Sequence, residues 1–181
     1  MKILIIFIGI SIININILIY QSDLNRYNNA QEDIKNLADE AAASAALYYN
    51  VEEYSMGYLV SNKEEALKHI EFLIYSYLNE KKNMKFLSVD YYIYIFDQSK
   101  KIFAYKNSEL QYVKEFEDPF NFIDEKGNKI LIEEPTIIIN FDAYFDDMFR
   151  LPFINKDSIS RSSMYVIKTR GNNFWYYRLL L

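Results

Sequence analysis

The chain has 181 residues, a formal net charge of −5 and no cysteine. This length accommodates one membrane anchor and one domain of roughly 130 residues with a single hydrophobic core. The acidic balance argues against nucleic acid as a partner, because binding to phosphates needs clustered Lys and Arg. The absence of cysteine excludes disulfides and thiolate chemistry.

The first predicted element is an apolar helix from Ile3 to Tyr20. At 1.5 Å per residue this run spans about 27 Å, which is enough to cross a hydrocarbon core. We expect residues 1–20 to be an uncleaved transmembrane anchor, and a cleaved signal peptide is the alternative, although no A-x-A cleavage site follows the run. Lys2 precedes the run, which favours an inside N-terminus. The predicted location is therefore the cell membrane, with a single pass and an extracellular C-terminal domain.

Two polar residues inside this run, Ser11 and Asn14, fall on one helical stripe together with Phe7 and Leu18. A polar side chain in lipid gains roughly 0.6–2 kcal/mol from a hydrogen bond to another helix. The stripe therefore predicts a contact with another membrane helix. The alternative is that these residues are merely tolerated products of AT-rich codons.

A second helical pattern continues from the anchor, because apolar residues recur at spacings of three and four from Leu24 onward. An alanine-rich run over residues 41–46 adds high helix propensity and allows close approach of another backbone. We expect a spine helix over residues 21–49, within a single extracytoplasmic domain over residues 21–181. The candidate contact residues on this helix are Leu24, Tyr27, Ile34, Ala38, Ala41 and Ala45.

The remaining elements are predicted from a change of period. Ser61 and Glu64 have capping-box spacing and begin a second helix, which ends near Asn79. Residues 51–60 are expected to form a connection or short strand with a turn at Gly57. Alternating or β-branched runs then predict strands at 88–96, 101–105, 130–132, 136–141, 164–169 and 174–180. This order predicts an α+β fold in which the helices pack on one face of an antiparallel β-sheet.

The segment from Tyr144 to Ile154 is too apolar for an ordinary loop. Two interpretations stay open. The segment is either a flap that covers the core or a contact surface for another subunit, in which Phe149 and Phe153 would take part.

Little in the sequence indicates chemistry. His69 is the only histidine, so a hydrolytic dyad or a His-rich metal site cannot be built. Asp142, Asp146 and Asp147 could gather around Ca²⁺, but they lack EF-hand spacing, and a solvated acidic face is the preferred interpretation. No phosphate-binding or dinucleotide motif is present. We therefore expect no enzymatic activity and no cofactor.

Composition also indicates a source. The frequent Ile, Asn, Lys, Tyr and Phe share AT-rich codons, which points to a low-GC bacterium. The 17 Tyr are then a product of base composition rather than a stacking surface.

Three segments beyond the anchor carry a family resemblance: Ile34–Ala43, Gly57–Val60, and Pro135–Ile139, the last followed by an apolar insertion and a final strand. On these features, which cover about two-thirds of the chain, the protein resembles the TadE/TadG-like minor pilins (pseudopilins) of tight-adherence and type IV pilus systems, in their Firmicutes form. Prepilins carry a Glu five residues after the Gly at their cleavage site. If Gly9 were the glycine at the cleavage site, Asn14 would stand where prepilins have the Glu. We therefore do not expect processing by a prepilin peptidase.

The resemblance implies a pilin-like fold. It also implies a structural subunit of a pilus or secretion apparatus, assembled with other subunits through its N-terminal helix. The alternative is a membrane-tethered extracellular binding or sensory domain.

Overall fold

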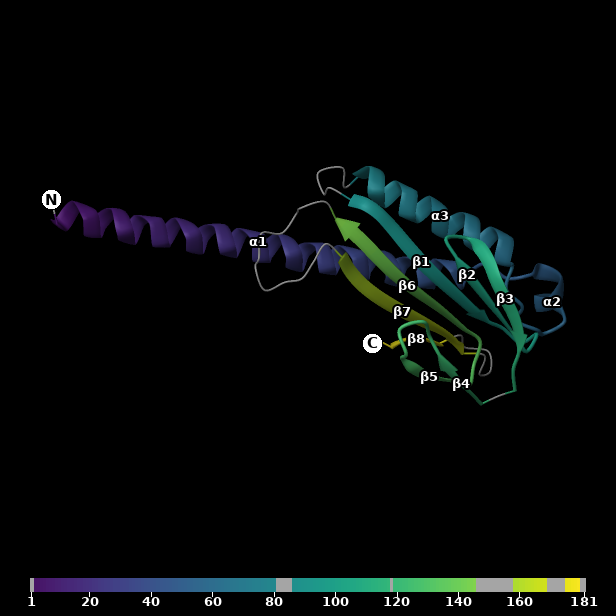
Figure 1. The fold of residues 1–181 in the computed structure, drawn as a ribbon. Helices are drawn as coiled ribbons and strands as arrows, with labels where there is room; N and C mark the ends of the chain where they lie inside the picture. The colour runs from purple at the N-terminus through teal and green to yellow at the C-terminus, as the bar shows by residue number, and fades with distance from the viewer. Residues whose placement is uncertain (1, 81–85, 118, 146–157, 169–174, 180–181) are drawn as a thin grey trace.

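The fold begins with one unusually long helix. In the computed structural model, which describes residues 2–80, 86–117, 119–145, 158–168 and 175–179, α1 (Lys2–Ala45) is continuous over 44 residues. Its first half extends away from the domain and its second half lies within it (Figure 1). The apolar run and the spine are therefore one continuous helix, as the helical pattern that continues past Tyr20 indicates.

The spine ends at Ala45 rather than near Tyr49. Tyr49 instead forms an isolated antiparallel bridge with Ser61, and the backbone N–H of Asn50 donates to the carbonyl of Val60 at 2.8 Å. These pairings hold Tyr49 and Asn50 against the segment before α3, after a turn at residues 46–47, so tertiary contacts override the local helix propensity.

The expected connection or short strand over residues 51–60 contains a short helix, α2 (Val51–Ser55). The side-chain oxygen of Asn50 caps it by accepting from the backbone N–H groups of Glu52 at 2.9 Å and Glu53 at 3.4 Å. The two acidic residues also suit the positive end of the helix dipole. The predicted turn at Gly57 is confirmed, with a φ of 88° that favours glycine.

The second long helix, α3 (Lys63–Glu80), begins slightly later than predicted. The side-chain oxygen of Asn62 accepts from the backbone N–H of Glu65 at 3.4 Å, whereas the hydroxyl of Ser61 donates to the carbonyl of Tyr48 at 3.4 Å. The prediction of Ser61 as the cap was therefore wrong by one residue, because Ser61 is engaged with the end of the spine.

The strands form two sheets, which together with the helices confirm the α+β class. The six-stranded antiparallel sheet has the order β3-β2-β1-β6-β7-β8, and β4 pairs only with β5. The strands are β1 (Phe86–Phe96), β2 (Lys101–Lys106), β3 (Glu109–Glu115), β4 (Phe120–Ile123), β5 (Lys129–Ile132), β6 (Thr136–Phe145), β7 (Ser158–Lys168) and β8 (Trp175–Leu179).

Both faces of the large sheet are covered. Alternate residues of a strand point to opposite faces, so Ile93 and Ile95 of β1 join the core beneath α1 and α3. Tyr94 and Phe96 of the same strand join a second core beneath the β4–β5 hairpin. The helices thus occupy one face, as predicted, and the β4–β5 hairpin, of which only β5 was predicted, covers part of the other (Figure 1).

Candidate functional site

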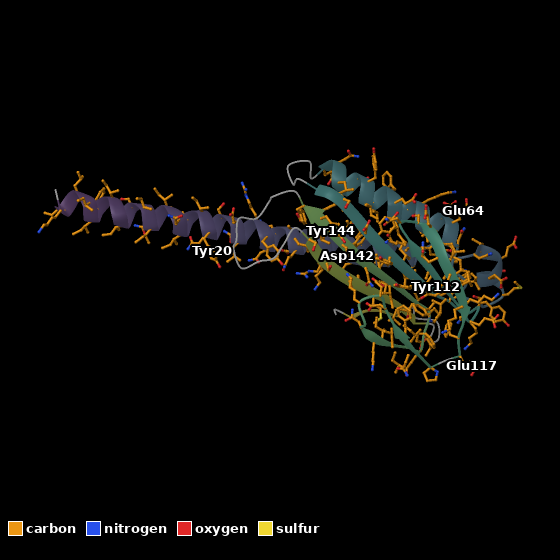
Figure 2. The ribbon with its side chains drawn as sticks, viewed as in Figure 1. Tyr20, Glu64, Tyr112, Glu117, Asp142 and Tyr144 are labelled. Carbon is orange, nitrogen blue, oxygen red and sulfur yellow. The ribbon has the colours of Figure 1, made fainter. Side chains whose placement is uncertain are left out.

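The first half of α1 is the most exposed apolar surface in the described residues. It is the one described helix long and apolar enough to span a membrane, judged by length and composition, and none of that window is buried in the domain. A signal sequence would have the same properties. Figure 2 shows Tyr20 on α1 near the point where the helix reaches the domain, with the side chains before it standing clear of the sheet.

Three polar side chains lie within this apolar run, and they differ in their hydrogen bonds. The hydroxyl of Ser11 donates to the carbonyl of Phe7 at 2.9 Å, and the amide of Asn16 donates to the carbonyl of Ile12 at 2.8 Å. Asn14 is exposed, and its side chain makes no hydrogen bond within the described part of the chain. Ser11 and Asn16 therefore each pair a side-chain donor with a carbonyl of their own helix. The amide of Asn14 keeps all its donors and its acceptor available for another partner.

The second half of α1 buries one face inside the domain. Four of the predicted contact residues, Ile34, Ala38, Ala41 and Ala45, are fully buried against the sheet and α3, and Tyr27 packs at the edge of this core. These side chains hold the spine to its own domain. A role for these four in contacts with another subunit stays a prediction, and the exposed surface of the spine lies on the opposite face of α1.

The other predicted contact residues divide between the described and undescribed parts of the chain. Leu24 is half-buried near the start of the domain. Phe149 and Phe153 lie outside the described residues, as does most of the apolar segment from Tyr144 to Ile154.

Small side chains on the buried face explain how α1 can lie so close to the sheet. Ala30, Ala38, Ala41 and Ala45 have no solvent exposure and belong to the core that α1 forms with α3 and the sheet. A side-chain hydrogen bond adds to this packing, because the hydroxyl of Ser163 on β7 donates to the carboxylate of Asp39 at 2.7 Å. The spine and sheet are thus joined by both packing and polar contact.

A buried carboxylate connects the start of α3 to the β1–β2 turn. Asp97 is 4% exposed and pairs with the Nζ of Lys63 at 2.7 Å. It also accepts from the backbone N–H groups of Ser61 at 3.2 Å and Ser99 at 3.0 Å. The Lys63 ammonium lies 4.1 Å from the centre of the Phe103 ring. The contacts with Ser61 and Lys63 join two segments of the fold and the contact with Ser99 fixes the β1–β2 turn, which is a structural role.

A second polar cluster attaches the β4–β5 hairpin to the sheet. Asp124 accepts from the backbone N–H groups of Lys126 at 2.9 Å and Asn128 at 2.8 Å, which fixes the hairpin turn. Asn140 on β6 donates to the carboxylate of Glu125 at 2.7 Å. These bonds supply partners for polar groups that the hairpin would otherwise bury unpaired.

Glu125 also contacts a tyrosine of the second core. The hydroxyl of Tyr94 donates to the Glu125 carboxylate. Burial raises the pKa of Tyr94, and this hydrogen bond raises the pKa further. The phenol is therefore held neutral and serves as a hydrogen-bond donor rather than as a nucleophile.

Two residues considered for metal or acid–base chemistry have structural partners. Asp142 accepts from the Nζ of Lys126 at 2.8 Å and from the hydroxyl of Ser160, while Asp146 and Asp147 lie outside the described residues. His69 lies between two aromatic rings, with centroid distances of 5.3 Å to Tyr48 and 6.3 Å to Phe72. Its surroundings are those of a packed side chain.

Comparisons with models of known protein families, with curated proteins and with solved structures find no match to this chain. A function must therefore be inferred from the geometry of the chain itself, and above all from α1.

Proposed function

We propose that the chain is a membrane-anchored structural subunit, similar to a minor pilin or pseudopilin, of a pilus or secretion apparatus. In this proposal the N-terminus is inside, the α+β domain is at the cell surface, and α1 provides the contact with other subunits. The observation that carries the proposal is the free amide of Asn14 in the middle of an otherwise apolar, exposed helix.

An amide in hydrocarbon is unfavourable unless its donors and acceptor find partners. Ser11 and Asn16 reduce that cost by bonding to the carbonyl four residues earlier. Asn14 has no such bond, so a neighbouring helix that supplies one gains roughly 0.6–2 kcal/mol. This favours assembly over a solitary anchor.

The continuity of α1 supports a structural role. Because one unbroken helix forms both the apolar half and the core of the domain, a contact made in the membrane fixes the position of the domain outside it. A flexible tether would serve a binding domain equally well, whereas a rigid helix suits a subunit that must be placed within an assembly.

A second candidate function has its own observation. A surface groove of about 600 Å³ lies between β3 and β4, lined by Ile102, Tyr112, Lys114, Phe120 and Phe122 among others. A groove with aromatic walls and one cation is suited to a small ligand or a peptide. This would favour a membrane-tethered extracellular binding or sensory domain.

Substitutions within the apolar half of α1 distinguish the two functions. Asn14→Leu in the full-length chain should weaken association with partner subunits by about 3- to 30-fold, which corresponds to one lost hydrogen bond. Asn16→Leu is the matched control, because Asn16 lies on another face and bonds to its own helix. The sizes of complexes extracted from membranes measure the effect. Equal complexes in both variants would favour the sensory domain.

A further inference from the structure

The face of α1 that points away from the sheet is uncovered along most of the helix. At about 100° per residue, Ser11, Asn14, Asn25, Asn29 and Asn36 fall within about 60° of one another. We call the helix surface that they share, which also carries Glu32, the back face. Its three asparagines in the domain, Asn25, Asn29 and Asn36, are all exposed.

The core residues of the spine lie on the other side of the helix. By the same rotation, Ile34, Ala38 and Ala41 are centred about half a turn from the back face. The sheet and α3 pack mainly on that buried side, and β7 also reaches Asp39 and borders a hollow lined by Asn36 and Glu40. The back face is therefore exposed from the membrane-spanning half to Asn36, where β7 begins to border it.

We propose that the partner on the back face is a second copy of this chain, with the two α1 helices parallel and in register. The inference rests on the proposed function, since it names the partner of the same helix. It adds that the assembly contains a symmetric pair of this chain.

Amide chemistry favours a second copy. An Asn side chain has both donors and an acceptor, so the same residue on two parallel helices can pair with itself. In a two-fold arrangement each patch meets its own copy. Asn14, Asn25, Asn29 and Asn36 would each face their counterparts, and Asn at such a position is known to fix register between two helices.

Steric access favours it as well. Because most of the domain packs about half a turn away, two helices can approach along residues 11–36, with β7 bordering the contact only at its end near Asn36, while the two domains point away from each other. That contact is about 38 Å long at 1.5 Å per residue.

Charge complementarity selects the parallel orientation. Lys35 and Glu40 lie on opposite flanks of the back face and are five residues apart. At this spacing the Lys35 ammonium of one parallel helix lies beside the Glu40 carboxylate of the other helix. The two-fold symmetry gives two such ion pairs. Glu32 lies on the back face itself and would meet Glu32 of the other copy, which is a repulsive contact.

Cysteine crosslinking in membranes tests the register directly, because the natural chain has no cysteine. Asn25→Cys, Asn29→Cys and Asn36→Cys, each as a single variant of the full-length chain, should give disulfide-linked dimers. A disulfide needs Cα atoms about 4.4–6.8 Å apart, so only an in-register pair links a residue to itself at all three positions. Lys101→Cys, an exposed site on β2, is the control and should stay monomeric.

Charge variants test the orientation. With Asn29→Cys as reporter, Lys35→Glu should lower the dimer yield about two- to five-fold, and Lys35→Glu with Glu40→Lys should restore it. Glu32→Gln should raise the yield, because the like-charge contact disappears. These residues lie on the exposed or half-exposed side of α1, and unchanged thermal unfolding would verify that the domain remains folded.

The outcomes separate the inference from the proposed function. Crosslinks at all three back-face positions with rescue by the charge swap would support the parallel pair. Absent crosslinks, equal crosslinking at Lys101→Cys, or a swap without rescue would overturn it. If Asn14→Leu still reduced association with other subunits in that case, the proposed function would stand and the partner would be a different chain.

Discussion

Ala41→Leu provides the most direct test of how α1 is built into the domain. Ala41 has no solvent exposure and belongs to the core between α1, α3 and the sheet. A leucine there adds three carbon atoms to a site where the helix already contacts β6 and β7. Overpacking of this kind costs about 1–3 kcal/mol. For a domain of this size that corresponds to a melting temperature lower by about 2–12 °C.

Ala43→Leu is the matched control for this change. Ala43 lies on the same helix, two residues away, but on the side that is only half-buried. Alanine and leucine have similar helix propensities, so the difference between the two variants reports packing alone. Thermal unfolding of the full-length protein in detergent, followed by circular dichroism, measures both. Equal melting temperatures for the two variants would refute the close packing of the spine.

Other predictions follow from the polar clusters and the anchor. Asp97→Ala should destabilise the domain by about 2–4 kcal/mol in urea unfolding, because it leaves the Lys63 ammonium without its buried partner, and Asp97→Asn should cost less. The raised pKa of Tyr94 means that its contribution to stability is complete below the unfolded pKa of about 10 and is lost as pH rises above it. Tyr94→Phe should therefore flatten the fall in stability between pH 9 and pH 12, and an equally steep fall would count against this reasoning. Mass spectrometry of the mature protein should find the apolar run intact, whereas an N-terminus near residue 21 would identify a cleaved signal peptide.

The helices and strands with a strong apolar pattern were predictable because the apolar positions in the sequence are the buried positions in the fold. The β6 strand is an example: residues Thr136–Phe141 are all buried, and the strand lies in the middle of the sheet between β1 and β7. Its run of isoleucines fills a core on each face, so composition alone indicates a central strand. The same argument holds for α1 and α3.

The β3 strand was missed for the opposite reason. All seven residues of Glu109–Glu115 are exposed, and the strand lies at the edge of the sheet. Its place is fixed by backbone pairing with β2, with an irregularity in register between Ala104 and Tyr105. Since neither face of β3 is buried, its sequence shows no alternation of apolar and polar residues. The β4 strand lies in the same acidic and aromatic stretch and was also missed.

The candidate site shows where sequence reasoning reaches its limit. Helical spacing is enough to place Ser11 and Asn14 on one face, and that placement needs only the rotation per residue. Spacing cannot decide which polar side chain bonds to its own helix, since that depends on rotamers. The structure separates Ser11 and Asn16, which bond to carbonyls four residues earlier, from Asn14, which does not.

The two faces of α1 should therefore respond to substitution in different ways. On the buried face, Ala41 contacts only its own domain, so its variants should change thermal stability and leave complexes of the correctly folded protein intact. On the back face, the side chains of Asn14 and Asn29 are exposed and make no hydrogen bond within the described residues, so their variants should change association and leave the melting temperature unaltered. In a helix that is simply an anchor, substitutions change only the stability of the domain. In a subunit that assembles through its helix, substitutions on one face change stability and those on the other change association.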